Sequence, residues 1–161
     1  MLSKTTLSAL RALLYIAQHS PTLMPPRRIA SALGESPTYL SKVTTQLAKA
    51  RLVRSERGAK GGVQLARPAA EITLLAVVEA CQGTVVGSYC RANCEPASVC
   101  AFHVAAEELE RSVVGTLERW TLQSLLSRPR AAGAESDGFP CMMLGPSEVV
   151  VRKPKKKRVR K

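Results

Sequence analysis

Apolar residues recur at helical spacing close to the start of the chain. They lie three or four residues apart, which is the period of an amphipathic helix, and they predict one over about residues 5–18. The residues on this face are Leu7, Leu10, Leu14 and Ala17. The helix should end before Pro21, because the residue preceding a proline disfavours helical geometry.

Two further helices follow, joined by a very short turn. A second helix is predicted over residues 27–33, and Gly34 can take the left-handed conformation that closes it. Ser36 then fits the N-cap of a third helix, with Pro37 in the favoured first position. Its inner face is predicted to hold Tyr39 or Leu40, Val43 and Leu47. Two helices with such a turn between them make a helix-turn-helix.

A glycine-rich hairpin is predicted directly after these helices. The strand candidates, residues 52–55 and 63–66, flank a segment with three glycines and two basic residues. Glycine permits the backbone of a tight loop, while Arg57 and Lys60 can reach phosphates or a narrow minor groove. A plain surface hairpin is the alternative, but the preceding helix-turn-helix favours a DNA-binding wing.

The second half of the chain carries a long apolar stripe. A short helix is expected over residues 72–80, closed by a buried Cys81. From Phe102, apolar positions follow in steps of three or four and predict one long helix that ends near Ser127. These positions are Phe102, Ala106, Leu109, Val113, Leu117 (or Thr116), Trp120 and Leu125 or Ser124. The stripe can pack on its own domain, but in a small protein it more often pairs with a second copy.

These patterns predict a mainly α fold with a small β wing: a winged helix-turn-helix plus a long dimerisation helix. The expected parts are a DNA-binding domain (1–83), a cysteine-rich cluster-binding loop (84–103), the dimerisation helix (104–127) and a disordered linker with a basic tail (128–161). The net charge of +12 points to a polyanionic partner, either nucleic acid or an acidic membrane surface. Eight of these charges lie within residues 152–161, so the folded part is only mildly basic.

The sequence also indicates the cellular compartment and the class of function to expect. Arg11 interrupts the first apolar run, so no signal peptide is expected, and no run is long enough to span a membrane. A reducing, cytoplasmic setting favours thiols or metal ligands over disulfides for the five cysteines. No paired carboxylates, nucleophile–histidine arrangement or phosphate-binding loop indicates an enzyme or a small-molecule substrate.

One short segment concentrates soft metal ligands. Its spacing is Cys90-x3-Cys94-x5-Cys100-x2-His103, just ahead of the long helix. Thiolates select zinc, copper(I) and iron–sulfur clusters. Three interpretations remain open from the spacing: an iron–sulfur cluster with His103 or an outside group as fourth ligand, a zinc ion on three cysteines and the histidine, or free thiols acting as a redox switch.

Residues 1–127 resemble the Rrf2 family of bacterial regulators, because several short motifs follow one another in the order typical of that family. The resemblance rests on the first-helix run from Ser8 to Ala17, on Ile29-Ala30, on residues 36–40, on residues 47–53, on the wing at 57–62 and on residues 79–83. It implies a winged helix-turn-helix homodimer that carries, in many members, an iron–sulfur cluster on three cysteines before the dimer helix.

The cysteine spacing is similar to that of one branch of this family. The half from Cys94 to His103 resembles the iron–sulfur assembly regulators, in which a histidine completes the ligation of a two-iron cluster. The interval after Cys90 is three residues here and five in that branch. The resemblance therefore implies [2Fe-2S] in preference to [4Fe-4S], with zinc as an alternative. Leu7 stands where the nitric-oxide-sensing branch has an aspartate ligand, which argues against that ligation.

The predicted function is a transcription regulator, a repressor, that binds double-stranded DNA as a homodimer at the bacterial nucleoid under the control of the cluster. The third helices of the two copies would enter successive major grooves. Candidate DNA contacts are Arg28, Thr38, Tyr39, Ser41, Lys42, Arg57 and Lys60, with Arg27, Lys49 and Arg54 as lesser phosphate contacts. The alternative is a zinc-stapled or thiol-based redox-responsive adaptor that binds DNA or protein.

Overall fold

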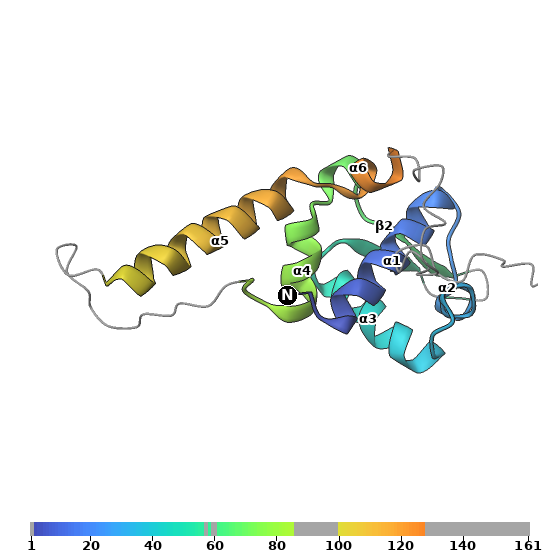
Figure 1. Cartoon of the computed structure of the whole chain (residues 1–161). Coiled ribbons are helices and arrows are strands. Elements are labelled where there is room, and N and C mark those ends of the chain that lie inside the picture. The colour runs from blue at the N-terminus through green and yellow to red at the C-terminus, as the bar shows by residue number, and fades with distance from the viewer. Residues whose placement is uncertain (1, 57, 59–60, 86–99, 128–161) are drawn as a thin grey trace, which may run out of the picture.

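A helical body and one projecting helix make up the described part of the chain (Figure 1). The computed structural model describes residues 2–56, 58, 61–85 and 100–127. The elements are α1 (Lys4–Gln18), α2 (Pro26–Leu33), α3 (Pro37–Lys49), β1 (Val53–Glu56), β2 (Gly62–Leu65), the 3-10 turn η1 (Ala69–Glu71), α4 (Leu74–Gln82), α5 (Ala101–Arg119) and α6 (Leu122–Ser127). The predicted fold class, mainly α with a small β wing, is confirmed.

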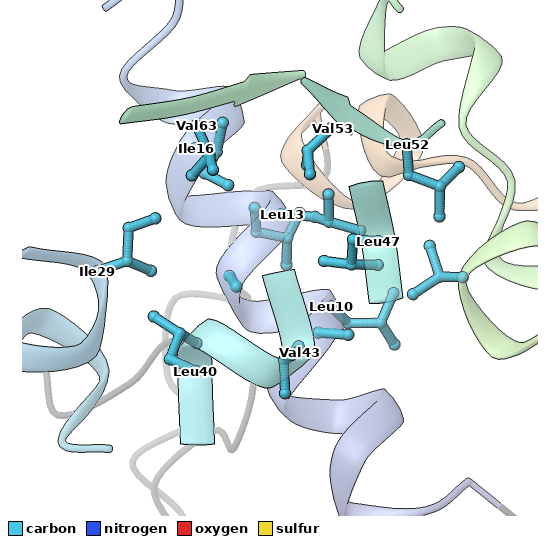
Figure 2. Packing of buried hydrophobic residues seen from close by; sticks show 14 of the residues in the cluster. Leu10, Leu13, Ile16, Ile29, Leu40, Val43, Leu47, Leu52, Val53 and Val63 are labelled. Atoms are coloured by element: carbon cyan, nitrogen blue, oxygen red, sulfur yellow. The ribbon is translucent and has the colours of Figure 1, made fainter. Parts of the chain in front are cut away.

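The buried face of α1 forms the centre of the body (Figure 2). Its residues Leu10, Leu13 and Ile16 are at most 2% exposed. They share one core with Leu40, Val43 and Leu47 of α3, with Ile29 of α2 and with Val63 of β2. Burial of one such side chain contributes about 1.5–3 kcal/mol, so this shared core holds the three N-terminal helices and the sheet together. The predicted inner face of α3 is confirmed at Leu40, Val43 and Leu47, and Tyr39 is half-buried beside it.

Hydroxyl side chains fix where three of the helices begin. The Oγ of Ser3 accepts a hydrogen bond from the Thr6 amide at the start of α1. Ser36 does the same for the Tyr39 amide at α3, and the Thr73 hydroxyl for the Ala76 amide at α4. Each satisfies a backbone donor that has no partner inside the helix. The predicted N-cap at Ser36 is therefore confirmed.

The wing is a two-stranded antiparallel sheet supported by a third backbone segment. The strands pair from Val53 with Leu65 to Glu56 with Gly62. The loop between α1 and α2 adds an isolated bridge, because Met24 and Val63 exchange two backbone hydrogen bonds of 2.9 Å each. This third segment was not predicted from the sequence. It ties the base of the wing to the helix-turn-helix.

The long helix predicted from Phe102 to Ser127 is wrong in its last part. Helix α5 ends at Arg119, and Trp120 is extended. Thr121 pairs with Thr73, the Trp120 carbonyl accepts a hydrogen bond from the Leu74 amide (2.8 Å), and the Leu122 amide donates to the carbonyl of Ile72 (2.9 Å). These backbone bonds take groups that a continuous helix would use for itself. They also place Leu122 in the core of the body, where its side chain is fully buried.

Cys81 is less buried than predicted. It is the last residue but one of α4, and its side chain is only partly buried against the core. Partial desolvation disfavours the thiolate and raises the pKa of the Cys81 thiol.

Within the described ranges, no helix has the length and apolar character needed to cross a membrane.

Gly62 in the wing has no room for a side chain. A Cβ at this residue would lie 2.8 Å from the carbonyl carbon of Met24, and the neighbouring atoms are backbone that cannot rotate away. We expect Gly62→Ala to lower the free energy of unfolding by about 1–3 kcal/mol, the usual range for overpacking, as measured by urea denaturation.

Gly115 offers the matched control. No atom lies within 4 Å of a Cβ built there, and the residue is inside α5. Gly115→Ala should leave the protein equally stable or stabilise it by up to about 1 kcal/mol through helix propensity. Equal stabilities for the two variants would contradict the close packing of Gly62 on Met24.

Candidate functional site

The turn between α2 and α3 is three residues long and determines how α3 is presented. Gly34 ends α2 with a φ of 67°, a left-handed conformation that suits glycine. Ser36 caps α3 and Pro37 occupies its first turn. A proline there costs no hydrogen bond, because the first amides of a helix have no intrahelical acceptor. The local sequence therefore both ends α2 and begins α3 with only Glu35 between the two caps.

The outer face of α3 carries short polar side chains and, in the first half of the helix, the cation of Lys42. Thr38, Ser41 and Lys42 are all exposed, while Leu40, Val43 and Leu47 are buried on the opposite face. Residues three or four apart share one side of a helix, so Thr38, Ser41 and Lys42 form a continuous surface. A hydroxyl or ammonium group on such a face can contact base edges or phosphates in a major groove.

An open groove runs between this face and the beginning of α2. Arg27 and the prolines at positions 25 and 26 line one wall, and Thr38, Ser41 and Lys42 line the other. Thr45 lies in the same groove and was not predicted from the sequence, although it continues the helical spacing from Ser41 and Lys42. Its hydroxyl donates a 2.8 Å hydrogen bond to the carbonyl of Ser41.

Tyr39 and Arg28, two predicted DNA contacts, have different surroundings. The Tyr39 ring packs against the core, and its hydroxyl donates a 3.4 Å hydrogen bond to the Oγ1 of Thr5 in α1. Tyr39 therefore helps to hold α3 against α1. Arg28 is exposed in the first turn of α2, next to Arg27.

The wing contributes a candidate contact surface that is only partly described. Arg57 and Lys60, the predicted wing contacts, lie outside the described residues. Gly58 between them has a φ of 118°, which favours glycine. Lys49 at the end of α3 and Arg54 on β1 are exposed.

Two of the four predicted metal ligands lie within the described residues. Cys100 occupies the N-cap position of α5 with its side chain exposed, and its thiol is free. His103 is half-buried in the first turn, and its amide donates a 2.9 Å hydrogen bond to the carbonyl of Cys100. Cys90 and Cys94 lie outside the described ranges. Within those ranges there is no group of three or more side chains that could hold a metal ion. The structure places Cys100 and His103 in the same helical turn and leaves the complete set of four untested.

The sequence and the fold were compared with known proteins. The family model named Rrf2, described as an iron-dependent transcriptional regulator, matches residues 2–128. The protein aau3 of Rhizobium meliloti (strain 1021) is 33% identical over 134 residues, which cover 80% of this chain and 87% of that protein. The HTH-type transcriptional regulator IscR of Vibrio atlanticus is 32% identical over 121 residues, 73% of this chain and 70% of that protein.

A solved structure has the same fold. CymR, the global cysteine regulator of B. subtilis, superposes with a TM-score of 0.67 at 24% sequence identity, over 81% of this chain and 98% of that chain. This likeness supports a winged-helix architecture for the described body.

A winged helix-turn-helix with an exposed polar face on its third helix defines a DNA-binding transcription regulator. The match over residues 2–128 and the identities above place the chain in a particular group of such proteins: it belongs to the Rrf2 family. The predicted family is therefore confirmed. The members are regulators of transcription, so the prediction that the chain is not an enzyme is confirmed as well.

Proposed function

We propose that this regulator is a homodimeric repressor whose binding to promoter DNA is controlled by an iron–sulfur cluster on Cys90, Cys94, Cys100 and His103. The observation that carries the proposal is the position of Cys100 and His103 in the first turn of α5, at the end of the helix remote from its attachment to the body. The description of the family as iron-dependent supports an iron-containing group.

DNA reading is assigned to the outer face of α3. Thr38, Ser41 and Lys42 would enter the major groove, with Tyr39 orienting the helix and contacting DNA from its edge. Arg28, exposed in α2 directly after the groove-lining Arg27, would contact phosphates, and Arg57 and Lys60 would do so from the wing. Such contacts fix the register of the protein on the duplex, while the α3 side chains select the sequence.

The exposed apolar face of α5 supports a dimer of this chain. Phe102 and Leu109, two residues of the predicted stripe, are 63% and 56% exposed, and none of the residues of α5 is buried. A helix with such a face is expected to be covered by a partner. The partner proposed is a second copy, because a symmetric pair also places two α3 helices for half-sites one helical turn apart, about 34–36 Å.

The attachment of α5 suggests how a ligand at its start would affect DNA binding. Its far end is fixed to the body by the backbone bonds of Trp120 and Leu122. Residues 84–100 precede its beginning, so ligation by Cys90, Cys94, Cys100 and His103 would join that segment to the start of the dimer helix. A bound cluster supplies a centre that oxidants, or a shortage of iron, can alter or remove. The separation of the two reading helices would then depend on whether the four residues are held together.

The donor set fits this group in the part that the structure describes. The Cys100 thiol is exposed, and the His103 side chain belongs to the same helical turn. The resemblance of the Cys94–His103 spacing to the iron–sulfur assembly regulators favours [2Fe-2S] over [4Fe-4S], and three thiolates with one imidazole also suit zinc. Zinc on the same residues, or thiols that oxidise, is the alternative and would make the protein a redox-responsive adaptor. The proposed place of action is the cytoplasm, at the nucleoid.

The first test concerns DNA contact by Lys42. Replacing it with alanine removes one cation from the proposed interface, so binding to a duplex selected from a random pool by the wild-type protein should weaken. The slope of log K against log salt should become less steep by about 0.9 for each phosphate that the protein no longer neutralises. Arg119→Ala, an exposed cation in the last turn of α5, should change neither quantity. Equal effects of the two substitutions would reject α3 as the reading helix.

The second test concerns the dimer. Leu109→Glu places a charge in the middle of the proposed seam and should convert the dimer to a monomer in analytical ultracentrifugation, with loss of tight DNA binding. Glu110→Gln, at the neighbouring exposed position, should leave the dimer intact. A wild-type protein that sediments as a monomer at micromolar concentration would overturn the proposed assembly.

The third test concerns the cluster. Cys94→Ala should abolish the visible absorption of anaerobically purified protein, remove iron and acid-labile sulfide, and change the affinity for the selected duplex. Cys81→Ala, in α4, should keep the absorption and the iron. A colourless wild-type protein with stoichiometric zinc would favour the zinc alternative, and one with no metal would favour the thiol switch.

A further inference from the structure

Three polar side chains lie between α1 and the turn of the helix-turn-helix. The Ser8 Oγ donates a 2.6 Å hydrogen bond to Oε1 of Glu35, and Nη1 of Arg11 lies 3.6 Å from the same oxygen. Nη2 of Arg11 also donates a 2.9 Å hydrogen bond to the carbonyl of Leu33. Ser8 is buried, and the side chains of Arg11 and Glu35 are only 18% and 13% exposed. We name this set the turn cluster.

The turn cluster holds the one residue that separates the two caps. Glu35 follows Gly34, the cap of α2, and precedes Ser36, the cap of α3. Its amide donates a 2.9 Å hydrogen bond to the carbonyl of Ala30, so its backbone is fixed to α2. The side chain, in turn, is fixed to α1. A movement of Glu35 would therefore reorient the first turn of α3.

The contribution of the turn cluster to the stability of the body does not explain why these polar side chains are placed there. Burial of an ion pair costs desolvation energy that the attraction between the charges only partly offsets. Within the described residues, Nε of Arg11 and Oε2 of Glu35 are buried and have no hydrogen-bond partner, so the pair is also incompletely satisfied. An apolar contact between α1 and the turn would stabilise the body at least as well. It would lack the directional bonds that specify one orientation of the turn.

We infer that Ser8, Arg11 and Glu35 are positioning residues that orient α3 against α2 and thereby determine the sequence selectivity of DNA binding. They act through the turn, from the side facing α1, and touch no DNA themselves. The inference rests on the proposed role of α3 as the reading helix. It does not depend on the cluster or on which signal is sensed.

The main test replaces the ion pair with apolar side chains of similar size. In the double variant Arg11→Met, Glu35→Leu, the melting temperature should be unchanged or raised. The ratio of affinities for the selected duplex and an unrelated duplex of equal length should fall at least tenfold. Affinity for the unrelated duplex and its salt dependence should stay at the wild-type values, because every proposed phosphate-binding residue is retained. A folded double variant with wild-type selectivity would overturn the inference.

A milder variant tests the inference even if the double variant fails to fold. Ser8→Ala removes only the 2.6 Å hydrogen bond to Glu35 and should reduce selectivity several-fold. Ser127→Ala is the matched control, because that exposed hydroxyl accepts a hydrogen bond from Gln123 in α6 and has no link to the turn. Unchanged selectivity in a folded Ser8→Ala protein would overturn the inference.

The same measurements separate this inference from the function on which it rests. If the wild-type protein selects no duplex from the random pool, the proposed DNA reading fails and the inference fails with it. If the wild-type protein is selective, Lys42→Ala weakens binding and the turn variants remain fully selective, then only the positioning role is rejected.

Discussion

The structure depends on the burial of one face of α1. Leu10, Leu13 and Ile16 are almost completely removed from water, and α2, α3, α4 and β2 all contact this helix. The hydrophobic effect acts without direction, so these contacts account for cohesion but leave the angles between the helices loosely specified. Directional bonds at the edges of the core supply that information. The cap at Ser36, the bridge from Met24 to Val63 and the turn cluster are three such sets.

The two ends of α5 have unlike surroundings. Its last residues lead into backbone pairing with the segment before α4 and into the fully buried Leu122. Its first turn holds Cys100 and His103, and its apolar residues Phe102, Val104 and Leu109 are exposed. A long helix fixed at one end converts a small change of angle at the attachment into a larger displacement at its tip. This geometry would suit the proposed regulator, in which the dimer helix couples the ligand residues to the reading helices.

The sites proposed for regulation and for DNA reading are separated in space. The proposed ligands Cys100 and His103 belong to the first turn of α5, the end of the helix that projects from the body (Figure 1). The groove between α2 and α3 belongs to the body. Selectivity can therefore be altered through the turn cluster without touching the ligand residues.

The sequence by itself determined the elements whose signals are local. Gly34, Ser36 and Pro37 specify the turn and the start of α3 through backbone bonds within a few residues, and the apolar period specifies which face is buried. Only the tertiary structure decided features that join distant segments: the break at Trp120, the Met24 strand beside the wing, the half-buried Tyr39 and the pairing of Arg11 with Glu35. In each of these, a residue is held by a partner far away along the chain. A helical period continues unchanged through such a position, because the competing backbone partner contributes nothing to the local pattern.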